Sequence, residues 1–116
     1  MSKPRVFITH EPLKFDRSTG KMTRWADLSP AAEFGTMVFM LPPGPAPNDL
    51  QASLPKIQDK LKDFTADDFL MAVGNPALLA CAAAIAARAA NGKLQVLVWQ
   101  TSVKRYGLIS ADVWAN

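Results

Sequence analysis

The chain has 116 residues, of which 49% are hydrophobic and 20% are charged, and its formal net charge is +3. This composition excludes a disordered chain, and the length predicts one globular domain that spans residues 1–116. The single cysteine, Cys81, excludes a disulfide framework within one chain, and we expect its side chain to be buried as a small apolar group.

The first part of the chain predicts a strand followed by a hairpin. Residues 5–9 are β-branched and aromatic, which favours a strand. Residues 14–25 place Phe15 and Met22 among polar side chains, on either side of a turn that contains Gly20. This alternation is typical of an antiparallel hairpin with one solvated face.

The middle of the chain predicts a short helix, a strand and a long helix. Ser29 as N-cap and Pro30 at the first helical position predict a single helical turn that Gly35 ends. Residues 37–41 are apolar on both faces, as in a strand that is covered on both sides. Apolar residues at helical spacing then predict a helix over residues 51–64.

Residues 69–73 and 94–99 predict two strands on either side of an alanine-rich helix. Asn75 is a good N-cap, Pro76 suits the first helical position, and Gly92 follows the helix where a left-handed residue is favoured. A right-handed crossover makes the two strands parallel. Because this helix carries a single charge, we expect it to be packed between other elements rather than to lie on the surface.

These elements predict an α/β domain with a small mixed sheet. Its core is a parallel βαβαβ arrangement of strands 37–41, 69–73 and 94–99, with two main helices. The N-terminal hairpin and a C-terminal strand at residues 105–109 add antiparallel strands to it.

No set of residues predicts a catalytic or metal site. The one histidine, His10, follows the first strand beside Glu11, and no nucleophile is tied to it, so we interpret it as a solvated residue at the edge of the sheet. One histidine and scattered carboxylates offer too few ligands for a metal, and we interpret Asp67 and Asp68 as a polar turn. We therefore expect no enzyme activity, no cofactor and no metal.

One alternative is a small enzyme or an anion or nucleotide binder at Gly74 and Asn75. These residues open a helix at the carboxyl end of a predicted parallel strand, where ligands gather in open α/β sheets and where helix amides bind phosphate. The turn lacks the further glycines and the Gly-Lys-Ser/Thr sequence of nucleotide-binding loops. An ordinary turn with a helix cap explains it equally well.

A second alternative is single-stranded nucleic acid. Six basic and two acidic residues fall within residues 1–25, whereas the remaining residues include seven basic and eight acidic ones. Cations interleaved with aromatic rings suit phosphate neutralisation and base stacking. A solvated hairpin whose aromatic residues point inward is the competing interpretation, and no RNA-recognition or helix-turn-helix pattern is present. The candidate contact residues are Lys14, Arg17, Lys21, Arg24 and Trp25.

We expect the chain neither to cross a membrane nor to be exported. The apolar stretch over residues 69–90 is interrupted at residues 74–76, and the helix of about 15 residues that remains is shorter than the roughly 20 that span a bilayer. The N-terminus does not resemble a signal peptide, and a lone cysteine fits the reducing cytoplasm.

Three stretches of the sequence, residues 27–31 (DLSPA), 73–76 (VGNP) and 97–99 (LVW), together resemble small accessory proteins of tailed bacteriophages. The resemblance covers most of the chain. It implies a protein that acts in the bacterial cytoplasm during infection and that binds a partner rather than turning over a substrate. It assigns no role to any residue.

The main functional hypothesis is therefore a non-enzymatic accessory protein that docks on a host or phage protein, with a homodimer among the possible assemblies. Aromatic residues near the predicted sheet edges favour docking, because tryptophan and tyrosine are enriched at interface hot spots. These residues are Trp25, Trp99, Tyr106 and Trp114.

Overall fold

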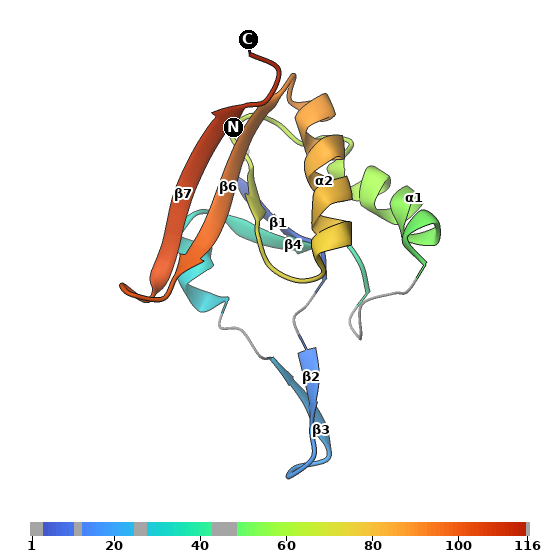
Figure 1. Ribbon diagram of the computed structural model, residues 1–116, viewed down its shortest axis with the longest axis vertical. Helices are drawn as coiled ribbons and strands as arrows, with labels where there is room; N and C mark the ends of the chain where they lie inside the picture. Colours follow the sequence, from blue (N-terminus) through green and yellow to red (C-terminus); the bar gives the residue numbers. More distant parts are fainter. Residues whose placement is uncertain (1–3, 11–12, 25–27, 43–48, 116) are drawn as a thin grey trace.

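The computed structural model describes residues 4–10, 13–24, 28–42 and 49–115. Its main sheet has five strands in the order β4-β1-β5-β6-β7, and strands β2 and β3 form a second sheet of two strands (Figure 1). The elements in chain order are β1 (Arg5–Ile8), β2 (Leu13–Asp16), β3 (Lys21–Arg24), the short helix η1 (Ser29–Glu33), β4 (Thr36–Phe39), α1 (Leu50–Leu61), β5 (Phe69–Met71), α2 (Pro76–Ala89), β6 (Lys93–Gln100) and β7 (Arg105–Asp112).

The pairing of the strands confirms the predicted α/β fold with a small mixed sheet and two main helices. Strands β4, β1, β5 and β6 run parallel, and β7 pairs antiparallel with β6. The unit β5-α2-β6 is parallel, as the turn and cap residues of its helix predicted.

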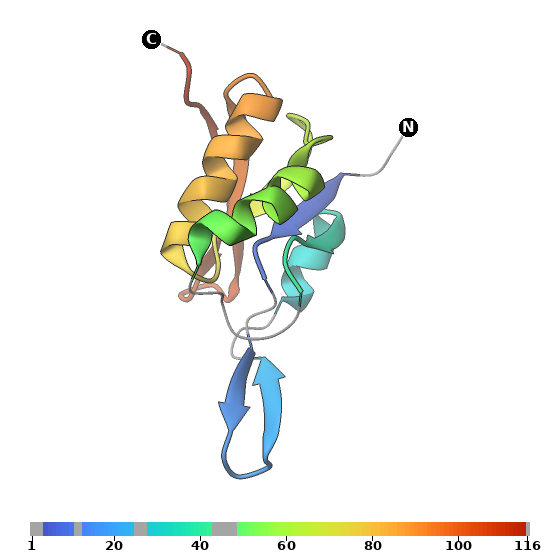
Figure 2. The same ribbon diagram turned by 90° about the vertical axis from the view of Figure 1, so that its right-hand side faces the viewer.

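The N-terminal part is arranged differently from the prediction. We expected the hairpin to add strands to the main sheet, whereas β2 and β3 form a sheet of their own that projects from the body (Figures 1 and 2). Strand β1 instead lies inside the main sheet, between β4 and β5. The physical reason is burial, because Val6, Phe7 and Ile8 are completely buried while Arg17 and Lys21 of the hairpin are exposed.

The handedness of the connections explains which face each helix covers. The chain crosses from β4 to β5 through α1 and from β5 to β6 through α2, and both steps run in the same direction across the sheet. Right-handed crossovers therefore place both helices on one face. The step from β1 to β4 runs in the opposite direction, and its helix η1 lies on the other face (Figure 2).

Each face of the sheet carries an apolar cluster. On the helix side, β1 and β5 pack beneath α1 and α2 through Phe7, Ile57, Leu61, Leu70, Leu78 and Ala82. On the η1 side, the sheet packs against the short helix through Val6, Ile8, Leu28, Ala31, Met71 and Leu97. The sheet is thus covered on both faces, which explains why its central strands are apolar throughout.

The predicted start of α2 is confirmed, its end lies earlier than predicted, and the predicted cap of η1 is wrong. Asn75 caps α2. The helix ends at Ala89, and two left-handed residues follow its C-cap, Asn91 with a φ of +56° and Gly92 with a φ of +87°. In η1 the N-cap is Leu28, which makes no side-chain cap, rather than Ser29. Because the turn begins one residue earlier than predicted, the serine falls inside it.

Helix α2 is covered on two sides rather than all round. The sheet and α1 cover its Leu78 side, but a stripe of Ala77, Ala80, Ala84 and Arg88 faces solvent. Cys81 is half-buried, so its predicted full burial is wrong for the same reason. Helix α2 has 14 residues, and no helix in the described part of the chain is long and apolar enough to span a bilayer.

Candidate functional site

The order of the strands places a topological switch point between β1 and β5. From β1 the chain continues to β4 on one side, and from β4 it returns across to β5 on the other. In open α/β sheets ligands bind beyond the carboxyl ends of the strands at such a point. Thr9 and His10 follow β1 there, and the turn at Gly74 and Asn75 follows β5.

The position of β1 overturns our interpretation of His10. The residue follows a central strand and is 7% exposed, so it is buried rather than solvated at an edge. The turn at Gly74 lies directly against it, because a Cβ at Gly74 would approach His10 Nε2 to 3.1 Å and Thr9 Oγ1 to 3.0 Å. With a φ of +99°, the backbone conformation at this position favours glycine, and a Cβ there would also crowd the two side chains.

The first amides of α2 are already hydrogen-bonded within the chain. Asn75 Oδ1 accepts from the N–H groups of Ala77 at 2.8 Å and of Leu78 at 3.2 Å. A phosphate at this helix end would compete with that cap. The anion site at Gly74 and Asn75 therefore stays a prediction, and the described residues contain no cluster of metal-ligating side chains.

An open cavity of about 630 Å³ lies between the end of β4 and helix α1. Its charged lining residues, Lys56, Asp59 and Lys60, are all exposed. The cavity thus offers apolar surface from Phe39, Pro42 and Pro55, while its described lining includes no fixed polar group that would orient a ligand.

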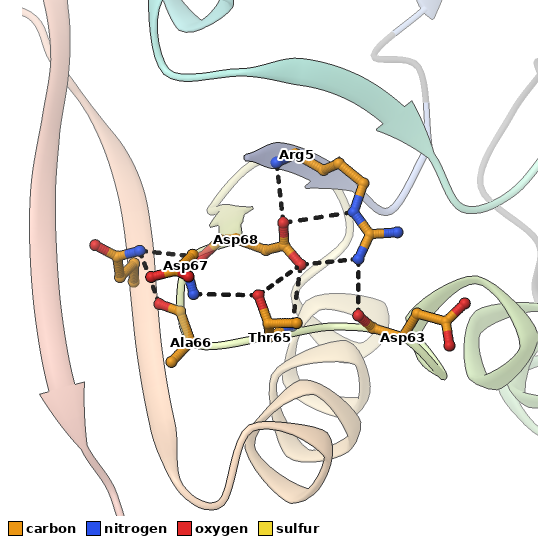
Figure 3. Close-up of polar contacts among 7 residues, drawn as sticks. Arg5, Asp63, Thr65, Ala66, Asp67 and Asp68 are labelled. Atoms are coloured by element: carbon orange, nitrogen blue, oxygen red, sulfur yellow. Dashed lines mark hydrogen bonds and ion pairs between the residues drawn. The ribbon is translucent and has the colours of Figure 1, made fainter. Parts of the chain in front are cut away.

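At the opposite end of the parallel strands, a buried carboxylate joins three segments of the chain (Figure 3). Asp68, directly before β5, accepts from the backbone N–H of Arg5 at 3.0 Å, and its Oδ2 lies 2.9 Å from Arg5 Nη2. Oδ2 also accepts from the N–H of Thr65 at 3.0 Å. Arg5 Nη2 donates in addition to the carbonyl oxygen of Asp63 at 2.7 Å. We call Arg5, Asp68 and Thr65 the clamp.

The clamp fixes the charge state of Asp68. Its side chain is 4% exposed, and this burial raises the pKa of the carboxyl. Hydrogen bonds from Arg5 and Thr65 and the charge of Arg5 outweigh burial, so the pKa lies below the ordinary value of 3.8. The two acidic residues are thus more than a polar turn, because Asp67 is exposed while Asp68 ties β1 to β5.

Four of the five candidate nucleic-acid contact residues lie on the hairpin within the described structure. Arg17 and Lys21 are exposed beside the turn at its tip. Lys14 and Arg24 lie on β2 and β3, opposite Thr23 and Leu13, and Trp25 lies outside the described residues.

The tip itself is held by Asp16. It accepts from the Ser18 hydroxyl at 2.6 Å and from the Ser18 N–H at 2.9 Å. These bonds lower the pKa of Asp16.

The antiparallel ribbon of β6 and β7 carries most of the exposed apolar side chains. Of the seven large apolar residues exposed in the described structure, six belong to this ribbon, its turn or the residues directly after it. We call these six residues the ribbon surface: Trp99, Val103, Leu108, Ile109, Val113 and Trp114.

Of the aromatic residues predicted at sheet edges, the structure exposes two and buries one. Trp99 and Trp114 belong to the ribbon surface, whereas Tyr106 is buried, with its ring 5.1 Å from that of Trp99. Sequence reasoning missed Leu108 and Ile109. The signal that would have found them is that β7 is the last strand of the chain and continues, without any charge, as far as Asp112.

Comparison with known proteins gives one match. The family model described as "Phage Pam3 gp32-like protein" matches residues 4–113. No curated protein and no solved structure matches the chain.

Proposed function

The chain belongs to the family of phage Pam3 gp32-like proteins, and from that premise we propose that it is a non-enzymatic binding protein that docks on another protein through the ribbon surface. The family membership confirms the resemblance to phage accessory proteins. The proposal places its action in the cytoplasm of the infected bacterium, on a partner protein of the phage or its host.

One observation supports this proposal above the others, namely the clustering of exposed apolar residues on one ribbon. Scattered single apolar residues are ordinary on a protein surface, whereas a contiguous group marks an interaction site. Trp99 and Trp114 are of the residue type that contributes most at interface hot spots. Trp114 is 57% exposed, so its ring is available to fill a pocket on a partner.

Affinity capture from lysate of phage-infected cells tests the proposal. Trp114→Ala is compared with the wild-type chain and with Met22→Ala, a matched control that removes an exposed apolar side chain from the hairpin. We expect at least one protein whose recovery falls about tenfold or more with Trp114→Ala, because a hot-spot residue contributes about 2 kcal/mol. Equal recovery of every protein by all three baits contradicts the proposal.

A second candidate function, single-stranded nucleic-acid binding, is favoured by the way the hairpin projects from the body (Figure 2). A two-stranded hairpin with no third strand is marginal in water by itself, so a partner along its length would stabilise it. Arg17 and Lys21 are exposed on it and available to phosphates.

Filter binding across a salt series tests this candidate. Replacing Arg17 and Lys21 with alanine should flatten the slope of log affinity against log salt by about one to two units, since each lost phosphate contact removes about 0.7 of a unit on single strands. The matched control replaces two other exposed lysines, Lys60 in the last turn of α1 and Lys62 directly after it, and should leave the slope unchanged. No retention of single-stranded DNA or RNA at low salt removes this candidate.

A further inference from the structure

We propose that strand β7 pairs with β7 of a second copy of this chain, in antiparallel orientation about a two-fold axis. The pairing joins two five-stranded sheets into one continuous sheet. This inference rests on the proposed protein-docking function and names one partner, which occupies the centre of the ribbon surface at Leu108 and Ile109.

The two edges of the main sheet differ in how they are protected. Strand β4 at one edge has four residues, and Met37, Val38 and Phe39 in it are partly buried. Strand β7 at the other edge has eight residues, and nothing in the described part of the chain lies outside it (Figure 1). Leu108 is 48% and Ile109 is 55% exposed.

Natural proteins protect an exposed edge with charges, prolines, bulges or a covering segment, because its free N–H and C=O groups recruit other strands. Between Arg105 and Asp112, β7 contains no charged residue and no proline. Its ladder with β6 is regular over all eight residues, so no bulge turns the edge away. Such an edge is an aggregation hazard unless a specific strand covers it.

The charges at the two ends of β7 indicate that the covering strand is β7 of a second copy. Arg105 is the first residue of β7, Lys104 ends the turn directly before it, and Asp112 is its last residue. Antiparallel pairing of two identical strands brings the basic end of each copy beside the acidic end of the other. The same strand is therefore complementary to itself, as a two-fold interface requires.

Symmetry restricts the register further. A two-fold axis that relates neighbouring antiparallel edge strands is perpendicular to the sheet, so each face of one copy continues as the same face of the other. Leu108 lies on the η1 face, opposite Leu97, and Ile109 lies on the helix face, opposite Val96. Residues that oppose one another share a face, so Leu108 cannot pair with the partner's Ile109.

The axis must then pass through a single residue pair. With Leu108 opposite the partner's Leu108, Asp112 comes at both ends of the interface beside the partner's Lys104, the turn residue directly before the partner's β7. With Ile109 opposite the partner's Ile109, Asp112 would instead oppose the partner's Tyr106. Charge pairing thus selects the register centred on Leu108.

The same arrangement extends the ribbon surface. Antiparallel pairing brings the end of the ribbon that carries Trp99 and Val103 beside the end of the partner's ribbon that carries the partner's Val113 and the partner's Trp114. Each dimer therefore presents two joined apolar regions, and a docking protein would contact both chains.

Light scattering and cysteine crosslinking test the inference. We expect the mass of a dimer for the wild-type chain and the mass of a monomer for Leu108→Lys. In a Cys81→Ala background, Leu108→Cys should form a disulfide-linked dimer on oxidation. Directly opposed Cβ atoms lie about 5 Å apart, close to disulfide separation, whereas diagonal neighbours lie about 7 Å apart. Ile109→Cys, the matched control on the same strand, should stay uncrosslinked.

A wild-type monomer at all concentrations overturns the inference, and so does a dimer that persists in Leu108→Lys. Crosslinking by Ile109→Cys instead of Leu108→Cys overturns the register. A monomer that still loses a captured protein on Trp114→Ala overturns the dimer and leaves the proposed function standing. A dimer whose captured proteins are insensitive to Trp114→Ala supports the dimer and overturns docking on a further partner.

Discussion

Asp68 lies directly before β5 in the interior of the main sheet, Leu108 lies on its edge strand β7, and the surroundings of the two residues differ in opposite ways. The carboxylate of Asp68 is polar, buried and bound by donors from its own chain. The side chain of Leu108 is apolar and half-exposed on an edge strand. A buried group whose partners lie within the chain contributes to folding, whereas an exposed apolar group gains its burial from another molecule. The clamp therefore stabilises the fold, whereas β7 is suited to association with another chain.

The largest expected effect comes from breaking the clamp. Asp68→Ala leaves the N–H groups of Arg5 and Thr65 without their acceptor and the guanidinium without its counter-charge. We expect the free energy of unfolding to fall by about 3 kcal/mol. Urea denaturation measures it, and Asp67→Ala, which removes the adjacent exposed carboxylate, should cost less than about 0.5 kcal/mol. Equal losses in the two variants would show that the clamp does not hold β1 to β5.

A smaller effect on the free energy of unfolding should appear when the pH is lowered. Because the pKa of Asp68 is depressed in the folded protein, its contribution is fully present above the ordinary value of 3.8 and is lost as the pH falls through the lower folded value. The difference in unfolding free energy between wild type and Asp68→Asn should therefore shrink as the pH falls below about 4. Each unit of depression corresponds to about 1.4 kcal/mol. Asp16, whose pKa is also lowered, is present in both chains and cancels.

The smallest effect on folding should come from β7. A dimer that forms only from folded chains makes the melting temperature rise with protein concentration. Leu108→Lys should abolish this rise while changing the stability of the monomer by no more than about 0.5 kcal/mol, since the side chain is half-exposed there. Thermal melts over a dilution series measure both quantities. A large loss at the lowest concentration would mean that Leu108 belongs to the core, and the comparison would fail.

The sequence was sufficient for those parts of the fold that depend on neighbouring residues. Asn75, Pro76 and Gly92 lie within one helix and its ends, and they predicted the parallel unit β5-α2-β6 correctly. The position of β1 depends instead on pairing with strands 31 and 63 residues further along, as Arg5 with Thr36 and Val6 with Phe69 show. No local pattern encodes such a choice between partners.

The same dependence on residues that are distant in sequence limited the prediction of the candidate site. The sequence predicts an edge position for His10 because it does not show which strands lie on either side of β1. It predicts a simple turn at Asp68 because Arg5 is distant in sequence. Both errors follow from one misplaced strand. The exposed stretch of β7 was also visible in the sequence only as an apolar strand, because exposure depends on what the rest of the chain leaves uncovered.

The hairpin has a consequence for how such a protein diversifies. It is inserted in the connection from β1 to β4, and the main sheet closes without it because β1 pairs directly with β4 and β5. Lengthening a segment between fixed anchors costs only about 0.6 kcal/mol for each doubling. Substitutions and insertions in the hairpin therefore place little demand on the body. The arm can therefore change in length and sequence over generations while the fold beneath it stays the same.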